Sequence, residues 1–226
     1  MAGVLYAIPT PLGGAPAAAL PAPALEVVRG LRRFAVENEK SARAFLKAVG
    51  MPVPIASLEV AVLDPDAHLR ALEAGESLGL LSEAGAPCVA DPGAALVAAA
   101  QDAGIRVVPL VGPSSILLAL TASGLEGQRF AFCGYLPREA EPRVRRIREL
   151  EARSRRERET QIFIETPYRN DALLAALLET CAPATRLCVA TELTLPDESV
   201  RTRRVGDWRA ARPAIGKRPT VFLLLA

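Results

Sequence analysis

The chain has 226 residues, of which 50% are hydrophobic and 23% are charged, and its formal net charge is +2. This composition excludes wholesale disorder, and the length permits one large domain or two small ones, each with its own core. The small net charge gives no sign of nucleic-acid binding by the molecule as a whole, so any such affinity must come from local basic patches.

Short apolar runs alternate with helical patterns in the first half of the chain. Helices are predicted at 24–32, 41–49, 68–74 and 94–103, and strands at 4–8, 34–36, 58–63, 78–81 and 106–110. This alternation predicts a mostly parallel sheet covered on both faces. Ligands of such sheets bind beyond the carboxyl ends of the strands.

The same alternation restarts after a helix at 116–123. Helices are predicted at 144–158 and 172–180, and strands at 130–133, 161–165, 187–190, 200–205 and 220–225. We therefore predict an α/β protein with two domains, 1–113 and 114–226.

Four loops that follow predicted strands are rich in Gly, Pro and small polar residues. They read PTPLGG (9–14), SEAGAP (82–87), GPSS (112–115) and ETPYR (165–169). Small residues let the backbone approach a ligand closely, and prolines fix the shape of a loop. Simple turn chemistry explains any single loop equally well, but four such loops at strand ends favour a ligand site.

Two further segments are open to a structural explanation. Asp91 followed by Pro92 is typical of a helix start, with Asp91 as the cap. Nine arginines between Arg138 and Arg158 are interspersed with glutamates, which is consistent with an ion-paired, solvated helix face. Because arginine exceeds glutamate, this segment is equally a candidate for phosphate contacts.

The cysteines and the histidine argue against several kinds of chemistry. The four cysteines form no CxxC pair, so we interpret them as buried thiols and predict neither disulfides nor a metal site. The only histidine, His68, lies in a Pro-Asp-Ala-His turn far from any motif, which argues against a Ser-His-Asp or Cys-His mechanism.

The N-terminal residues lack the basic flank of a signal peptide, and apolar stretches such as 116–122 are too short to span a bilayer. We therefore expect a cytoplasmic protein without a membrane segment.

Taken together, the loops resemble the tetrapyrrole methylase superfamily, and most closely its branch that 2′-O-methylates a cytidine of small-subunit ribosomal RNA. The resemblance covers nearly the whole chain and is carried by LYAIPTPLG (5–13), LLSEAGAPCVADPG (80–93), VPLVGPSS (108–115), GYLPR (134–138), FIETPYR (163–169) and ATELT (190–194).

This resemblance implies two αβα domains, a homodimer, and S-adenosylmethionine in a cleft between the domains. The residues that it implies at the cofactor are Pro11, Gly13, Ser82, Glu83, Ala84, Gly85, Ala86, Pro87, Ser114, Ser115, Phe163, Glu165, Pro167, Ala190 and Thr191.

The sequence departs from this branch in two motifs. The branch typically has Cys-Glu-Asp-Thr-Arg where this chain has VENEK (36–40), and Ser-Asp-Ala-Gly-Thr-Pro where it has SEAGAP (82–87). The branch also commonly carries a basic C-terminal extension beyond the position of Ala226. We therefore expect a shorter paralogous group.

Methyl transfer from a sulfonium mainly requires alignment and exclusion of water, but a ribose hydroxyl also needs a base. Glu37 and Glu165 are the candidate bases, and Lys40 and Arg169 are candidate orienting or phosphate-binding groups. An ion pair between Glu165 and Arg169 is the alternative role for both.

Three functions stay open. The first is methylation of RNA, with Arg138–Arg158 as the candidate RNA contact. The second is methylation of a tetrapyrrole-like or other small molecule. The third is that of an inactive cofactor- or RNA-binding paralogue.

Overall fold

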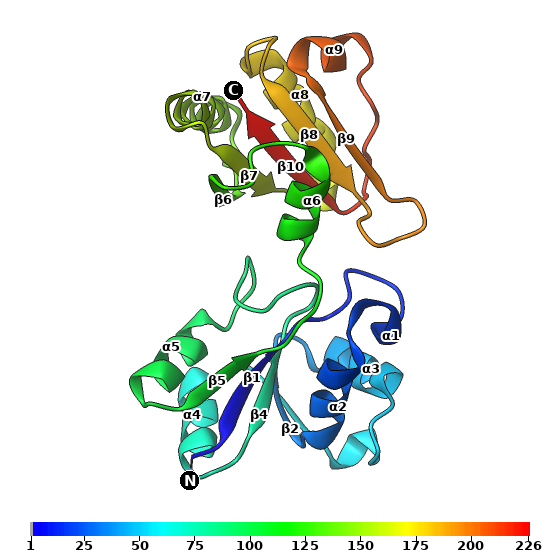
Figure 1. Cartoon of the computed structure of the whole chain (residues 1–226), viewed down its shortest axis with the longest axis vertical. Coiled ribbons are helices and arrows are strands. Elements are labelled where there is room, and N and C mark those ends of the chain that lie inside the picture. Colours follow the sequence, from blue (N-terminus) through cyan, green and yellow to red (C-terminus); the bar gives the residue numbers. More distant parts are fainter. Residues whose placement is uncertain (1) are drawn as a thin grey trace. The chain divides into compact units, whose positions relative to one another are not determined.

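The computed structural model describes residues 2–226, and these divide into two compact units (Figure 1). The first unit extends to Ser114, and the second comprises Ser115–Ala226. Each unit contains one five-stranded sheet and its own helices, so the chain is α/β, as the sequence predicts.

The sheet of the first unit is entirely parallel, with the strand order β3-β2-β4-β1-β5. Its strands are β1 (Val4–Ile8), β2 (Arg33–Val36), β3 (Glu59–Val62), β4 (Leu78–Leu81) and β5 (Arg106–Pro109). Because β1 and β4 are neighbours inside the sheet, the loops that follow them leave from the same edge.

Helices cover both faces of this sheet, as predicted. On one face, α2 (Ala22–Gly30) and α3 (Glu39–Val49) pack over a core that includes Phe34. On the other, α4 (Pro65–Glu73) and α5 (Ala94–Asp102) pack over a core that includes Ala35. Consecutive residues of β2 thus point into opposite cores, because side chains alternate between the two faces of a sheet along a strand.

The sheet of the second unit is mixed, a pairing that the sequence pattern did not predict. Its order is β6-β7-β10-β8-β9, and only β6 and β7 are parallel. The strands are β6 (Phe130–Tyr135), β7 (Thr160–Ile164), β8 (Arg186–Thr191), β9 (Ser199–Arg204) and β10 (Thr220–Leu225). Only residues 192–198 join β8 to β9, which is too short for a parallel crossover and forces an antiparallel hairpin.

The main core of the second unit lies between this sheet and α7 (Ala140–Glu157), α8 (Asn170–Thr180) and α9 (Val205–Ala210). Phe163 and Phe222 stack at its centre, with ring centroids 6.0 Å apart. The remaining long helix, α6 (Ser115–Ser123), packs against β8, β9 and β10.

The remaining differences from the predicted elements concern the ends of elements and the presence of short helices. The structure adds α1 (Pro16–Ala19) within the predicted Pro/Gly/Ala-rich loop, and α9 starts at Val205, where a strand end was predicted. α7 starts at Ala140, four residues earlier than predicted, because Pro142 in its first turn is compatible with a helix.

His68 lies within α4, so the prediction that it stands in a turn is wrong. The helix starts early because Asp64, two residues after the end of β3, is its N-cap. The Asp64 carboxylate accepts hydrogen bonds from the backbone N–H groups of Asp66 and Ala67. Pro65 then occupies the first helical position, where proline is favourable.

We expect Phe222→Ala to lower the free energy of unfolding of the second unit by about 3–5 kcal/mol, because it removes a fully buried ring from the centre of the core. The fluorescence of Trp208, the only tryptophan and a member of the same core, reports this in a urea titration. Phe130→Ala is the control, since Phe130 is 40% exposed. Equal losses for the two variants would contradict this assignment of the core.

Candidate functional site

The loops that follow β1 and β4 are joined by a pair of backbone hydrogen bonds. Thr10 N donates to Gly85 O (2.9 Å) and Gly85 N donates to Thr10 O (3.0 Å). Side chains reinforce this bridge, because Ser82 Oγ donates to Gly85 O (2.6 Å) and Thr10 Oγ1 donates to Ser82 O (3.2 Å). Thr10 and Ser82 are buried, so these two loops form a fixed unit.

The loop that follows β5 lies against the other two. A Cβ atom at Gly112 would lie 2.6 Å from Pro9 Cβ, so only glycine permits this approach. Gly85 has a φ of +85°, which favours glycine, and a Cβ atom there would lie 3.7 Å from Pro113 O. Three of the four predicted loops therefore meet at the carboxyl edge of the first sheet.

A cavity of about 290 Å³ opens beside this junction. Pro11, Gly13, Ser82 and Glu83 of the predicted cofactor set line it, whereas Ala84, Gly85, Ala86 and Pro87 lie in the same loop but are not among its lining residues. α3 forms another wall of the cavity with Ser41, Ala42, Ala44, Phe45 and Ala48. Sequence reasoning missed the α3 wall, because its residues give only the pattern of an amphipathic helix.

Three carboxylates gather at the same edge. Glu37 follows β2, while Glu83 and Asp91 follow β4. Burial raises the pKa of Glu37, and the negative charge of Glu83 raises it further, although a hydrogen bond from the Glu83 backbone acts in the opposite direction. Ser41 Oγ donates to Glu83 Oε1 (2.6 Å). One oxygen of Glu37 and one of Asp91 are buried without a hydrogen-bond partner among the described residues.

Asp91 belongs to this cluster and does not cap a helix, so the prediction of a capping role is wrong. α5 starts at Ala94, and its N-cap is Gly93 with a φ of +124°. Burial raises the pKa of Asp91 to about 6, with smaller contributions from the charges of Glu37 and Glu83. Cys88 and Ala90 in the same loop also have positive φ, a conformation that costs a few kcal/mol and commonly marks ligand-binding loops.

Two residues of the segment that departs from the rRNA branch lie at the start of α3. Asn38 caps this helix, and its Oδ1 accepts a hydrogen bond from Lys40 N (2.9 Å). The Lys40 side chain is exposed. An amide at position 38 is therefore fully compatible with the local fold.

The fourth predicted loop lies in the second unit, directly after β7. Glu165 is buried and forms the expected ion pair with Arg169 Nη2, and its Oε1 also accepts from Thr166 N (2.7 Å). The second carboxylate oxygen, Oε2, is buried without a partner among the described residues, as is Arg169 Nη1. Both groups thus retain one unused hydrogen-bonding atom.

The remaining residues of the predicted cofactor set are mostly part of the fold. Phe163 stacks on Phe222, Ala190 is fully buried in β8, and Thr191 is 3% exposed. Pro167 starts a short 3₁₀ helix, and Ser114 and Ser115 are half-buried at the start of α6. Contacts from Phe163 and Ala190 to a ligand would therefore come from the backbone.

Asn170 is a residue near the fourth loop that sequence reasoning missed. It is fully buried, and its Nδ2 donates to Arg218 O (2.8 Å), which fixes the loop before β10. The signal available in the sequence was a polar residue directly after the ETPYR motif.

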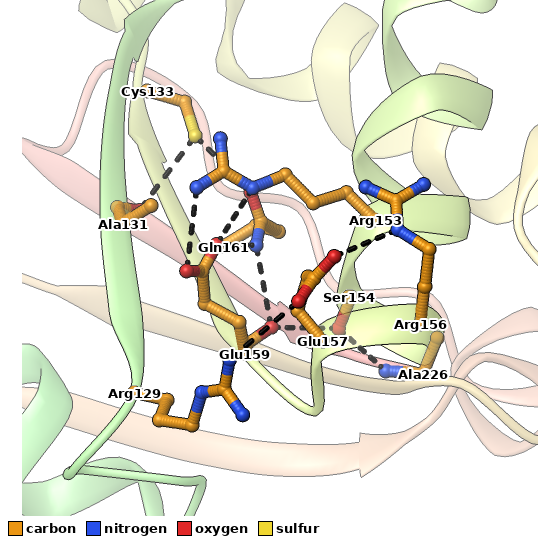
Figure 2. Close-up of polar contacts among 10 residues, drawn as sticks. All are labelled: Arg129, Ala131, Cys133, Arg153, Ser154, Arg156, Glu157, Glu159, Gln161 and Ala226. Carbon is orange, nitrogen blue, oxygen red and sulfur yellow. Dashed lines mark hydrogen bonds and ion pairs between the residues drawn. The ribbon is translucent and has the colours of Figure 1, made fainter.

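The arginine-rich segment is only partly ion-paired. Five of its arginines form ion pairs: Arg145, Arg146, Arg153, Arg155 and Arg156. Figure 2 shows the pairs at the end of α7, where Arg153 Nε lies 2.9 Å from Glu159 Oε1 and Arg156 Nε 2.7 Å from Glu157 Oε1. Within residues 2–226 the other four have no ion pair, namely Arg138, Arg143, Arg148 and Arg158.

The cysteines are free, with Cys181 and Cys188 buried as predicted, while Cys88 and Cys133 are only partly buried. The described part of the chain contains no cluster of His, Cys, Asp and Glu side chains that could hold a metal ion. In the same residues, no helix has the length and apolar character needed to cross a membrane.

We expect Asp91→Asn to stabilise the first unit above pH 6 by about 1 kcal/mol, after allowance for partial exposure to solvent. The pKa of Asp91 is about 6 in the folded protein, above the ordinary value of 3.8. The contribution of the neutral carboxyl to the free energy of unfolding is therefore complete below pH 3.8 and is lost as the pH rises through 6. The difference between variant and wild type should thus vanish near pH 4 in thermal unfolding. Asp102→Asn, at an exposed end of α5, is the control; the same pH dependence there would refute the assignment.

Comparison with solved structures identifies the fold. The chain aligns over its whole length with the methyltransferase CobJ (TM-score 0.65, 19% identity, 94% of that chain). It aligns over 99% of its length with diphthine synthase (TM-score 0.68, 17% identity, 89% of that chain).

Sequence comparison identifies the family. Residues 18–208 match the model of the tetrapyrrole (corrin/porphyrin) methylases. The ribosomal RNA small subunit methyltransferase I of Mesorhizobium japonicum is 37% identical over 92% of this chain and 70% of the relative. That of Pseudomonas aeruginosa is 32% identical over 93% of this chain and 74% of the relative. The chain is therefore a methyltransferase that belongs to the tetrapyrrole (corrin/porphyrin) methylase family.

Proposed function

We propose that this methyltransferase uses S-adenosylmethionine to methylate a ribose 2′-hydroxyl of small-subunit ribosomal RNA. The observation that carries the proposal is 37% identity, over 92% of the chain, to an enzyme named for methylation of small-subunit ribosomal RNA. A ribosomal RNA substrate implies a cytoplasmic location.

The carboxylates that gather at the strand ends support a cationic cofactor. S-adenosylmethionine supplies a methyl group activated by a positively charged sulfonium. A cationic ligand would relieve the mutual repulsion of Glu37, Glu83 and Asp91, which burial and proximity already disfavour as anions. The residues proposed to hold the cofactor are Pro11, Gly13, Ser82, Glu83, Ala84, Gly85, Ala86, Pro87, Ser114, Ser115, Phe163, Glu165, Pro167, Ala190 and Thr191.

Glu37 is the stronger candidate for the base that accepts the hydroxyl proton. Its raised pKa makes it more basic than an ordinary carboxylate, and one of its oxygens has no hydrogen-bond partner among the described residues. The charge of Glu165 is already balanced by Arg169. We therefore assign Glu165 and Arg169 a positioning role, and Lys40 a role in orienting a phosphate.

For the RNA itself, we propose contacts from the arginines of the 138–158 segment that have no ion pair within residues 2–226. These are Arg138, Arg143, Arg148 and Arg158. We also propose a homodimer, which is supported by exposed apolar side chains on α6 and β6: Leu117, Leu118, Phe130 and Tyr135.

We expect S-adenosylhomocysteine to bind once per chain and to raise the melting temperature, because it binds only the native state. Gly85→Val should abolish most of this shift, since its side chain would intrude at the loop junction. Gly104→Val is the matched control, because Gly104 also has a left-handed φ of +67° but stands in the turn before β5, away from the loops. Each variant should lose about 1–2 kcal/mol of stability from backbone strain. Equal ligand shifts in the two variants would speak against the site.

We expect radiolabelled cofactor to transfer its methyl group to a ribose of small-subunit ribosomal RNA. Glu37→Gln should lower kcat by about 10²–10⁴-fold, the usual contribution of a general base, while S-adenosylhomocysteine affinity stays nearly unchanged. Glu39→Gln is the control, because Glu39 is exposed and pairs with Arg43. Label that enters a small molecule of a metabolite extract and not RNA would overturn the proposed acceptor.

A further inference from the structure

The edge strand β9 carries an unusual concentration of uncompensated positive charge. Arg201, Arg203 and Arg204 are all exposed, and none of them forms an ion pair within residues 2–226. α7 differs, because most of its arginines are paired with glutamates. In this unit, the free guanidinium groups are thus concentrated on β9 more than on the longer helix.

The pairing register adds a fourth arginine. Arg186 of β8 lies directly opposite Arg204 of β9, is exposed, and also has no ion pair in the described chain. Like charges directly opposite each other in a sheet are destabilising. An anion that contacts both guanidinium groups would remove this repulsion.

The neighbouring acids do not neutralise the strand. Glu198 precedes β9, and its carboxylate accepts a hydrogen bond from Thr194 N (2.7 Å) within its own loop. Asp197 in the same loop and Asp207 in α9 are exposed and form no ion pair with an arginine of β9. The acidic residues near β9 therefore do not compensate its positive charge.

Several contacts hold two of these arginines, and the strand itself, in place before any ligand arrives. The guanidinium of Arg203 lies over the Trp208 ring, 5.1 Å from its centroid, and Arg186 Nη1 donates to Gly124 O (3.1 Å). Thr202 Oγ1 donates to Ser123 O (2.6 Å), which ties β9 to the end of α6. Groups fixed in advance lose less conformational entropy on binding.

The geometry of the strand suits a polyanion with regularly spaced charges. β9 is the last strand of its sheet and pairs only with β8 (Figure 1). Arg201 and Arg203 are two residues apart, so they point to the same face about 6.7 Å apart along the strand, while Arg204 points to the other face beside Arg186. Arginines thus flank the open edge on both faces.

We propose that β9, together with Arg186, binds the phosphate backbone of the RNA acceptor. This inference rests on the proposed function, and it adds a surface that lies at the opposite edge of the sheet from β6 and outside the 138–158 segment. Arginine is suited to such contacts because its planar donors match phosphate oxygens.

The test is binding of a fluorescein-labelled fragment of small-subunit ribosomal RNA, measured by anisotropy across a series of salt concentrations. Arg201, Arg203 and Arg204 are replaced together by Ala in one variant. The matched control replaces Arg145, Arg146 and Arg156, which are exposed or half-buried and already paired with glutamates. The melting temperature of each variant with S-adenosylhomocysteine verifies that it is folded.

We expect the β9 variant to bind RNA at least about tenfold more weakly and to lower the magnitude of the salt slope by about 2, since three phosphate contacts are lost. The control should change both quantities much less. Equal losses in the two variants, or wild-type binding by the β9 variant, would overturn the proposal.

These outcomes separate the inference from the proposed function. If the β9 variant still binds and methylates ribosomal RNA normally, the inference fails and the proposed function stands. If the wild type neither binds nor methylates RNA, both fail. If polyglutamate displaces the RNA at equal charge concentration and binds through the same arginines, β9 recognises an acidic protein, and the assignment to RNA is wrong.

Discussion

Thr10 and Gly85 exchange two backbone hydrogen bonds just beyond the point where β1 and β4 end, and the geometry at this edge of the first unit depends on that bridge. It fixes the loops after two neighbouring parallel strands to each other. The buried hydroxyls of Thr10 and Ser82 satisfy the polar groups that such a junction would otherwise leave unpaired. The cavity lies beside this bridge, between the loops and α3.

Each unit retains a group of uncompensated charges, and the sign of these charges differs between the two units. In the first, Glu37, Glu83 and Asp91 crowd together at the carboxyl ends of β2 and β4. In the second, the arginines of β9 stand without acidic partners within residues 2–226. Like charges that lie close together repel each other, and this repulsion lowers stability. A cationic ligand would relieve the repulsion in the first unit, and an anionic ligand would relieve it in the second.

Much of the fold was predictable, because hydrophobic periodicity is a local property of the sequence. Strands 4–8, 78–81 and 220–225 coincide with β1, β4 and β10, and the α/β alternation is present in both units. The pairing direction of the second sheet was not predicted. Periodicity does not report direction; in this case the short, helix-free connection between β8 and β9 was the available signal.

For the candidate site, the sequence by itself determined that loops of small residues stand at strand ends, and parallel strands bring such ends to one edge. It also determined that Glu165 and Arg169, four residues apart, could pair. Only the tertiary structure decided that Asp91 joins Glu37 and Glu83 instead of capping α5, and that the arginines of α7 are largely paired while those of β9 are not. The reason is physical: charge compensation and burial depend on neighbours that are distant in sequence and become adjacent only when the chain has folded.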